Sequence, residues 1–205
     1  MKMQDVMFGG TETVASVIEW TLAELMKCPE YLKKVEQELV DVVGLNRRVQ
    51  ETDLENLTYL KCAVKETLRR DPSAWDEPEK FKPSRFLEDR SPDFKGSDFE
   101  FIPFGSGRRS CPGMALGLYG LEMAVVHLLH CFKWDLPNGM KVSELDMNGV
   151  FGLTAPELFS LLLCRTKVEL PALKFITSDE IYDCLGSSTC CLLFLFYLLS
   201  GSTKY

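Results

Sequence analysis

The sequence predicts a mainly α-helical fold with minor β structure. Apolar residues recur at helical spacing over most of the first 70 residues, and an apolar segment of helical length spans residues 114–132. Short strand-like segments with turn residues are confined to residues 134–171. The hydrophobic content of 46% and the charged content of 26% are those of a globular protein. The net charge of −7 argues against a general nucleic-acid-binding protein, because neutralising phosphates requires a basic surface.

The first helix is expected at residues 3 to about 27. Gly9 and Gly10, followed by Thr11-Glu12-Thr13, are expected to interrupt it, because each glycine inside a helix costs about 1 kcal/mol relative to alanine. These two glycines therefore need a packing or functional reason. The helix itself is predicted from apolar residues near helical spacing, which are Val6, Val14, Val17, Ile18, Leu22 and Leu25.

Two more helical regions follow. Pro29 suits the first turn of a helix that runs to about Val43, because the N–H that proline lacks would be unpaired there. Thr52-Asp53-Leu54-Glu55 has the spacing of a capping box and opens a third region. This region is expected to continue to Arg70, with a break near Leu57-Thr58.

A long irregular connection is expected between residues 71 and 107, which contain five prolines. Loops of this length are uncommon in compact domains unless they serve a function. A fourth helix is expected from Met114 to about Phe132, and its nearly uniform apolar character predicts burial in the core. Glu122, His127 and His130 argue against a membrane span at this helix.

The C-terminal part of the sequence changes character twice. Residues 134–171 are predicted to form short strands and turns, with Asn138-Gly139 as a tight turn. From residue 173 the sequence becomes a cysteine-containing apolar tail. Its ten-residue apolar run at residues 190–199 is too short to span a bilayer.

The eight cysteines form no zinc-binding pattern with the two histidines. Without a secretory signal, a disulfide framework is not expected either. Most of these cysteines are therefore predicted to be small buried apolar residues. Cys111 is the exception, because it lies in a polar, glycine-containing loop rather than in an apolar helix.

The loop FGSGRRSCPG, residues 104–113, brings a cysteine, two arginines and three glycines together in ten residues. Two arginines precede Cys111 and a helix follows it, and both favour a thiolate that can act as a nucleophile or a metal ligand. A nucleotide-binding loop is excluded by the glycine spacing. A cysteine protease lacks a general base, because His127 and His130 lie too far along the following helix. A thiolate that ligates an iron macrocycle fits better, with glycines clearing the ring and an arginine facing its carboxylates.

These residues carry a resemblance to a known family. Phe104, Gly107, Arg109, Cys111 and Gly113 match, position by position, the heme-binding loop of the cytochrome P-450 family of heme-thiolate monooxygenases. The resemblance implies a heme cofactor, an iron protoporphyrin, with Cys111 as its axial thiolate and metal ligand. It also implies that Arg109 pairs with a heme propionate.

Two further motifs occur in the order of that family. Gly9-Gly10-Thr11-Glu12-Thr13 resembles the oxygen-activating segment of the distal helix, so Glu12 and Thr13 are implied to be catalytic residues that help to deliver protons. Glu66-x-x-Arg69 resembles the paired residues of the K helix. Arg85, in the segment Pro83-Ser84-Arg85-Phe86, is implied to complete a structural triad with that pair.

Each motif has a plainer interpretation on its own. Glu66 and Arg69 could be an ordinary surface ion pair worth less than about 1 kcal/mol. Gly9 and Gly10 could mark a helix packing contact, and Thr13 could be hydrogen-bonded back into its own helix. The occurrence of all the motifs together, in order and beside the cysteine loop, favours the family.

The resemblance implies a monooxygenase that inserts one atom of dioxygen into an aromatic, phenylpropanoid-type substrate. NADPH-cytochrome reductase is implied as the electron donor. The family is located on the cytoplasmic face of the endoplasmic reticulum membrane, and its N-terminal anchor is not expected in this sequence. Segments 5–13, 99–109 and 151–154 resemble plant phenylpropanoid hydroxylases, in particular the ferulate (coniferaldehyde) 5-hydroxylases of lignin biosynthesis.

The sequence departs from the family pattern at two places. Residues 1–172 are expected to form a partial heme domain, the C-terminal part of the P-450 fold, with an internal deletion at residues 69–70. Residues 173–205 are expected to be a divergent apolar tail. The alternative to an enzyme is a truncated, non-catalytic remnant that does not form a working heme pocket.

Overall fold

The computed structural model describes residues 3–69, 73–88, 91–94, 96–136, 140–145, 147 and 164–167. Four α-helices dominate these residues, and they confirm the prediction of a mainly helical fold with minor β structure. The helices are α1 (Met3–Lys27), α2 (Pro29–Val42), α3 (Thr58–Leu68) and α4 (Met114–Cys131). The tight turn expected at 138–139 and the tail expected at 173–205 lie outside the described residues.

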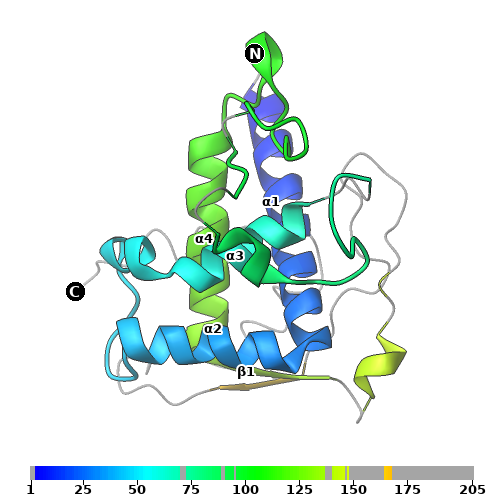
Figure 1. Ribbon diagram of the computed structural model, residues 1–205. Helices are drawn as coiled ribbons and strands as arrows, with labels where there is room; N and C mark the ends of the chain where they lie inside the picture. The colour runs from blue at the N-terminus through cyan, green and yellow to red at the C-terminus, as the bar shows by residue number, and fades with distance from the viewer. Residues whose placement is uncertain are drawn as a thin grey trace, which may run out of the picture.

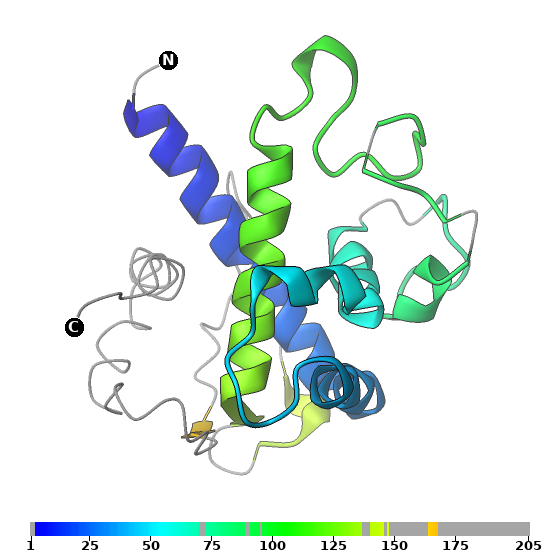
Figure 2. The same cartoon turned by 90° about the vertical axis from the view of Figure 1, so that its left-hand side faces the viewer.

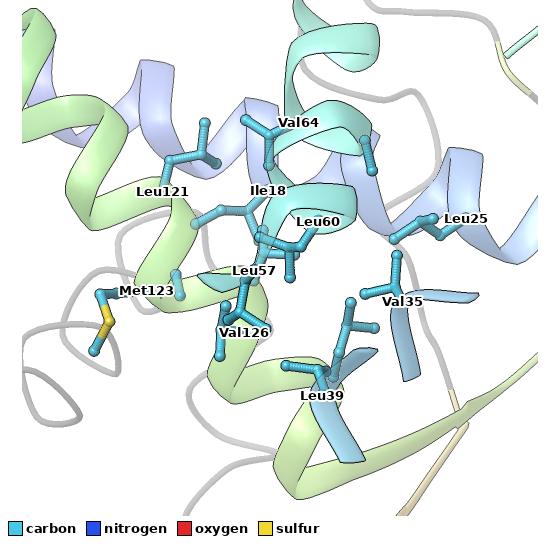
Figure 3. Packing of buried hydrophobic residues seen from close by; sticks show 14 of the residues in the cluster. Ile18, Leu25, Val35, Leu39, Leu57, Leu60, Val64, Leu121, Met123 and Val126 are labelled. Carbon is cyan, nitrogen blue, oxygen red and sulfur yellow. The ribbon is translucent and has the colours of Figure 1, made fainter. Parts of the chain in front are cut away.

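The helices enclose one main hydrophobic core. Figure 1 shows α1 and α4 alongside each other, with α2 across one end of the pair, and Figure 2 shows the same arrangement from the side. Ile18 of α1, Leu39 of α2 and Val126 of α4 are among the buried side chains that meet in this core (Figure 3). Leu57, Leu60 and Val64 add the contribution of α3 and of the residue before it.

A two-stranded antiparallel sheet follows α4. β1 (Phe132–Asp135) pairs with β2 (Cys164–Lys167), so that Phe132 lies opposite Lys167 and Asp135 opposite Cys164. In Figure 1 this sheet lies at the α2 end of the helices, whereas the loop that precedes α4 lies at the other end. The sheet and the loop therefore lie at opposite ends of α4.

The interruption predicted in the first helix is wrong, because α1 is one continuous helix from Met3 to Lys27. The Thr13 hydroxyl donates a hydrogen bond of 2.6 Å to the carbonyl oxygen of Gly9, one turn earlier. A Cβ atom built on Gly9 or Gly10 meets no heavy atom within 4 Å in the described structure. Close packing against the described residues therefore does not explain why these two positions are glycine.

The third helical region is divided as predicted, into a short 3-10 helix η1 (Glu51–Asn56) and α3, with Leu57 between them. The capping box predicted at Thr52 and Glu55 is wrong, because Thr52 lies inside η1. The buried carboxylate of Asp53 instead accepts the backbone N–H of Gln50 at 2.8 Å. Asp53 also binds both terminal nitrogens of Arg47, and this hydrogen bonding lowers the pKa of Asp53 below its ordinary value.

α4 is the one helix in the described part of the chain that is long and apolar enough to cross a membrane. Its C-terminal half is a core element instead. Leu121, Val125 and Val126 are buried in the main cluster. His127 Nδ1 donates to the carbonyl oxygen of Met123 at 2.8 Å. The predicted role of this segment as a buried core helix is therefore confirmed for its C-terminal half.

Candidate functional site

The structure brings Glu66, Arg69 and Arg85 together. The Nε atom of Arg69 lies 3.2 Å from Glu66 Oε1, and the Nε atom of Arg85 lies 2.9 Å from Glu66 Oε2. The side chain of Glu66 is fully buried, and those of Arg69 and Arg85 are 9% and 11% exposed. This burial excludes the alternative of an ordinary surface pair.

Burial and charge act on Glu66 in opposite directions. Burial raises the pKa of Glu66, whereas the backbone N–H of Lys82, at 3.1 Å from Oε1, and the two guanidinium groups lower it. Removing one charged member of this cluster is expected to destabilise the fold strongly, because the remaining buried charges would be left unpaired. The triad therefore acts as a fixed point in this part of the fold.

The same arginines fasten an irregular segment to α3. Arg69 donates to the carbonyl oxygen of Pro78, and Arg85 donates to those of Asp76 at 2.8 Å and Lys80 at 3.2 Å. Arg85 itself belongs to the 3-10 helix η2 (Pro83–Phe86). Without a regular ladder of its own, this segment depends on side-chain donors to satisfy its carbonyl groups.

The loop of residues 104–113 presents Cys111 at the start of α4. The backbone N–H of Cys111 donates to the carbonyl oxygen of Phe104 at 2.8 Å and closes the loop. Gly105 and Gly107 adopt φ angles of 72° and 65°, a left-handed region that favours glycine. The 3-10 turn η3 (Gly107–Arg109) places Arg109 just before Cys111.

Cys111 differs from the other described cysteines. Its side chain is exposed, whereas Cys62 and Cys131 are buried and Cys28 is half-buried. Burial raises the pKa of Cys131 to about 11, so its thiolate form is disfavoured. Among the four cysteines whose side chains the structure describes, Cys111 is thus the exposed thiol, the one that can reach a ligand without unfolding.

The residues of this loop fit one side of a flat macrocycle. Gly107, Arg109, Cys111 and Gly113 are all exposed. A Cβ atom at Gly107 would meet no heavy atom of the described structure within 4 Å, and one at Gly113 would lie 3.9 Å from Cys111 Sγ. The two glycines therefore leave the flanks of the thiol open, with a guanidinium available for a carboxylate at the edge of a ring.

The predicted catalytic residues, Glu12 and Thr13, lie on a different element. They belong to the N-terminal half of α1, which in Figures 1 and 2 lies at the same end of the molecule as the loop before α4. The Glu12 side chain is half-buried, and its charge adds to burial in raising the pKa of Glu19. The Thr13 hydroxyl bonds to Gly9, which is the helix-internal arrangement considered as the plainer alternative.

The structure adds to the argument against a cysteine protease. Both histidines bind backbone carbonyl oxygens at 2.8 Å, His127 that of Met123 and His130 that of Gly44. His127 follows Met114 by 13 residues on α4, which corresponds to about 20 Å along the helix. Neither histidine can therefore serve as a base for Cys111.

A surface hollow of about 500 Å³ lies between η1 and the first turns of α4. It is lined by Glu51, Tyr119 and Glu122 among others, and it includes none of the predicted site residues. The predicted cofactor-binding residues Gly107, Arg109, Cys111 and Gly113 are instead exposed on the surface of the cysteine loop.

Sequence reasoning missed several residues that hold the site together. Lys82 acts through its backbone N–H, which no side-chain pattern reveals. Trp75 and Phe101 lie in an aromatic cluster between the triad and the loop. The high density of aromatic residues between positions 75 and 104 is a sequence signal that could have indicated this cluster.

Comparisons with known proteins identify one family. A sequence profile of the Cytochrome P450 family matches residues 1–70 and 68–162. Cytochrome P450 84A1 of Arabidopsis thaliana is 57% identical over 201 residues, covering 80% of this chain and 39% of that protein. Cytochrome P450 84A4 of the same plant is 48% identical, covering 80% of this chain and 40% of that protein.

The fold agrees with this family. A solved structure of a zebra fish cytochrome P450 with abiraterone matches with a TM-score of 0.69 and 25% identity. That match covers 81% of this chain and 46% of the solved chain. The chain spans about two fifths of the length of the curated relatives it matches.

The matches are discontinuous near the end of α3. The two segments of the family match meet at residues 68–70. The alignment with Cytochrome P450 84A1 extends over 201 residues, which is more than 80% of this 205-residue chain. That relative therefore contains residues inside the aligned region that have no counterpart here.

Proposed function

The chain belongs to the cytochrome P450 family, and on that premise we propose that it is the heme-binding part of a heme-thiolate monooxygenase. The single observation that carries the proposal is the exposure of Cys111 in a closed, glycine-containing loop at the start of α4. Residues around this thiol leave room for a flat ring, whereas Cys62 and Cys131 are buried and Cys28 is half-buried.

Each residue of the loop has a defined task in this proposal. Cys111 would hold the heme iron as a thiolate ligand, and the Arg109 guanidinium would bind a heme propionate through a charge-assisted hydrogen bond. Gly107 and Gly113 clear the ring, while the carbonyl oxygen of Phe104 holds the Cys111 backbone. Heme bound in this way supplies an iron centre at which dioxygen is activated for transfer of one oxygen atom to an organic substrate.

Glu12 and Thr13 of α1 would handle protons at the same site. The Thr13 hydroxyl hydrogen is held by the carbonyl oxygen of Gly9, so its oxygen lone pairs remain available to accept a hydrogen bond from water. The half-buried Glu12 carboxylate supplies a nearby group that can take up and release a proton. Together they would hold and move protons for the chemistry that a bound heme supplies.

The substrate class is argued from the relatives. Identities of 57% and 48% to two Cytochrome P450 84A proteins support an aromatic, phenylpropanoid-type substrate. They also support the finer assignment to the ferulate (coniferaldehyde) 5-hydroxylases of lignin biosynthesis. Electrons would come from NADPH through a separate reductase, at the cytoplasmic face of the endoplasmic reticulum membrane.

The structural triad anchors the segment of residues 76–86 to α3 in this scheme. Glu66, Arg69 and Arg85 do not touch the substrate; they fix the irregular connection that leads to the heme loop.

The test is the absorption spectrum of the reduced, carbon-monoxide-bound protein after heme is added to the full chain. We expect the Soret band of thiolate-ligated heme, and we expect Cys111→Ser to lose it while keeping the same folded helical signal. Cys28→Ser is the matched control, because Cys28 is half-buried and outside the loop, and it should retain the band. A band that survives in Cys111→Ser would overturn the proposal.

A second candidate function follows from the discontinuity at residues 68–70. If the internal deletion that it supports removes part of the heme pocket, the chain is a non-catalytic remnant. The same spectrum, recorded at increasing amounts of added heme, distinguishes the two functions, since a remnant takes up no stoichiometric heme.

A further inference from the structure

Five aromatic rings form a continuous series between the buried triad and the cysteine loop. Trp75 contacts Phe86 and Phe101, with ring centroids 5.4 and 6.2 Å apart. Phe101 contacts Phe86 at 5.2 Å and Phe94 at 5.3 Å, and Phe94 contacts Phe104 at 5.8 Å. These separations and the inclined ring planes are those of favourable aromatic pairs. We call this series the aromatic ladder.

One end of the ladder is attached to the triad. The guanidinium carbons of Arg69 and Arg85 lie 6.0 and 5.9 Å from the centroid of Trp75, so the two arginines that bind Glu66 also face this ring. Lys65 of α3 lies over the rings of Phe86 and Phe94. Lys65 and Arg69 therefore hold the ladder against α3, and Arg85 of η2 contacts the ring of Trp75 as well.

The other end of the ladder reaches the loop that carries Cys111. Phe104 is the residue whose carbonyl oxygen accepts the Cys111 N–H at 2.8 Å. A Cβ atom at Gly96 would lie 3.2 Å from the carbonyl oxygen of Gly105, so the segment that follows Phe94 also approaches the loop backbone closely. A shift of Phe94 would therefore shift the loop, because its ring contacts Phe104 and the segment that follows it packs against Gly105.

Phe101 is the joint between the two ends. It is 2% exposed, and in the described structure it is the ring that contacts both Trp75 on the triad side and Phe94 on the loop side. Its backbone N–H donates to the carbonyl oxygen of Asp98 at 2.9 Å, and the Asp98 carboxylate accepts the N–H of Asp93 at 3.1 Å. The backbone therefore fixes the spacing between Phe94 and Phe101.

We propose that Phe101 is a positioning residue for Cys111, which transmits the placement of the Glu66–Arg69–Arg85 triad through Phe94 and Phe104 to the loop of residues 104–111. This inference rests on the proposed function, because a heme-thiolate site requires a thiol that is held in a fixed position. The coupling itself is a property of the chain and is measured without heme.

The test is amide hydrogen exchange, measured by peptide mass spectrometry on the full chain without added heme. Phe101→Leu should increase exchange of the hydrogen-bonded amides of the loop, those of Gly105, Ser110 and Cys111, by about ten-fold or more, because the ring contacts that restrain the loop are lost. Exchange in α4 beyond Leu121 should stay within about two-fold of the original protein. Uniform acceleration in both regions would show a general loss of stability and would overturn the proposal.

Phe132→Leu is the matched control. Phe132 is equally a buried phenylalanine with an aromatic neighbour, Trp134, but it lies in β1 at the far end of α4. This variant should leave exchange at residues 104–111 unchanged. Acceleration of the loop equal to that in Phe101→Leu would contradict the proposal.

Phe94→Leu keeps the proposal testable if Phe101→Leu does not fold, because Phe94 is only partly buried. It breaks the ladder at its last joint before the loop, so it should accelerate exchange at residues 104–111 while α4 beyond Leu121 is unaffected. Unchanged exchange in the loop would overturn the proposal. None of these outcomes depends on heme uptake, so a failed heme titration and a failed coupling are separate results.

Discussion

The two ends of α4 differ in what surrounds them. At the C-terminal end, Leu121, Val125 and Val126 are buried among α1, α2 and α3. At the N-terminal end, Leu116 is 77% exposed and follows the exposed Cys111. The C-terminal end of α4 therefore contributes to the hydrophobic core, whereas its N-terminal end and the preceding Cys111 are exposed to solvent. A cofactor bound to Cys111 would cover this exposed end.

The triad joins α3 to the irregular segment that leads to the cysteine loop, and its loss should have the largest effect. Glu66→Gln should lower the free energy of unfolding by about 3–5 kcal/mol, because it removes the buried charge that pairs with two nearly buried arginines. Urea denaturation followed by circular dichroism measures this change. Glu77→Gln, which removes an exposed partner of Lys80, should leave the midpoint unchanged. Equal effects of the two substitutions would contradict the assigned role of the triad.

Two leucines on the same helix test the contrast directly. Leu121→Ala should destabilise the protein by about 2–5 kcal/mol, because it leaves a cavity in the main core. Leu116→Ala should change stability by less than about 0.5 kcal/mol in the absence of heme, because its side chain is exposed. A large loss of stability in Leu116→Ala would show that the N-terminal end of α4 is covered in solution.

The positions of the helices could be predicted from the sequence, but the cap of η1 could not. The helices follow from apolar spacing, and the break at Leu57 follows from the interruption of that pattern. The cap of η1 was missed because both Thr52-x-x-Glu55 and Gln50-x-x-Asp53 have acidic residues at the required spacing. The structure uses Asp53, because Arg47 is placed to bind its carboxylate.

Features that depend on distant residues could not be predicted in this way. The ring contacts of Phe101 join positions that are up to 26 residues apart, and the N–H of Lys82 reaches Glu66 across 16 residues. The expected interruption of α1 at Gly9 and Gly10 was wrong, because helix propensity is only a weak preference that the surrounding helix overrides. The motif residues themselves were identifiable, because their chemistry is carried by residue type and spacing.

The most direct test of the account is the effect of heme on the two ends of the molecule. Amide exchange of the full chain is measured with and without stoichiometric heme. We expect heme to slow exchange at residues 104–117 and 9–13 by about ten-fold or more, and to leave exchange at residues 121–131 nearly unchanged. Protection that is absent at residues 104–117, or that appears equally in Cys111→Ser, would contradict the assignment of this open end as the heme site.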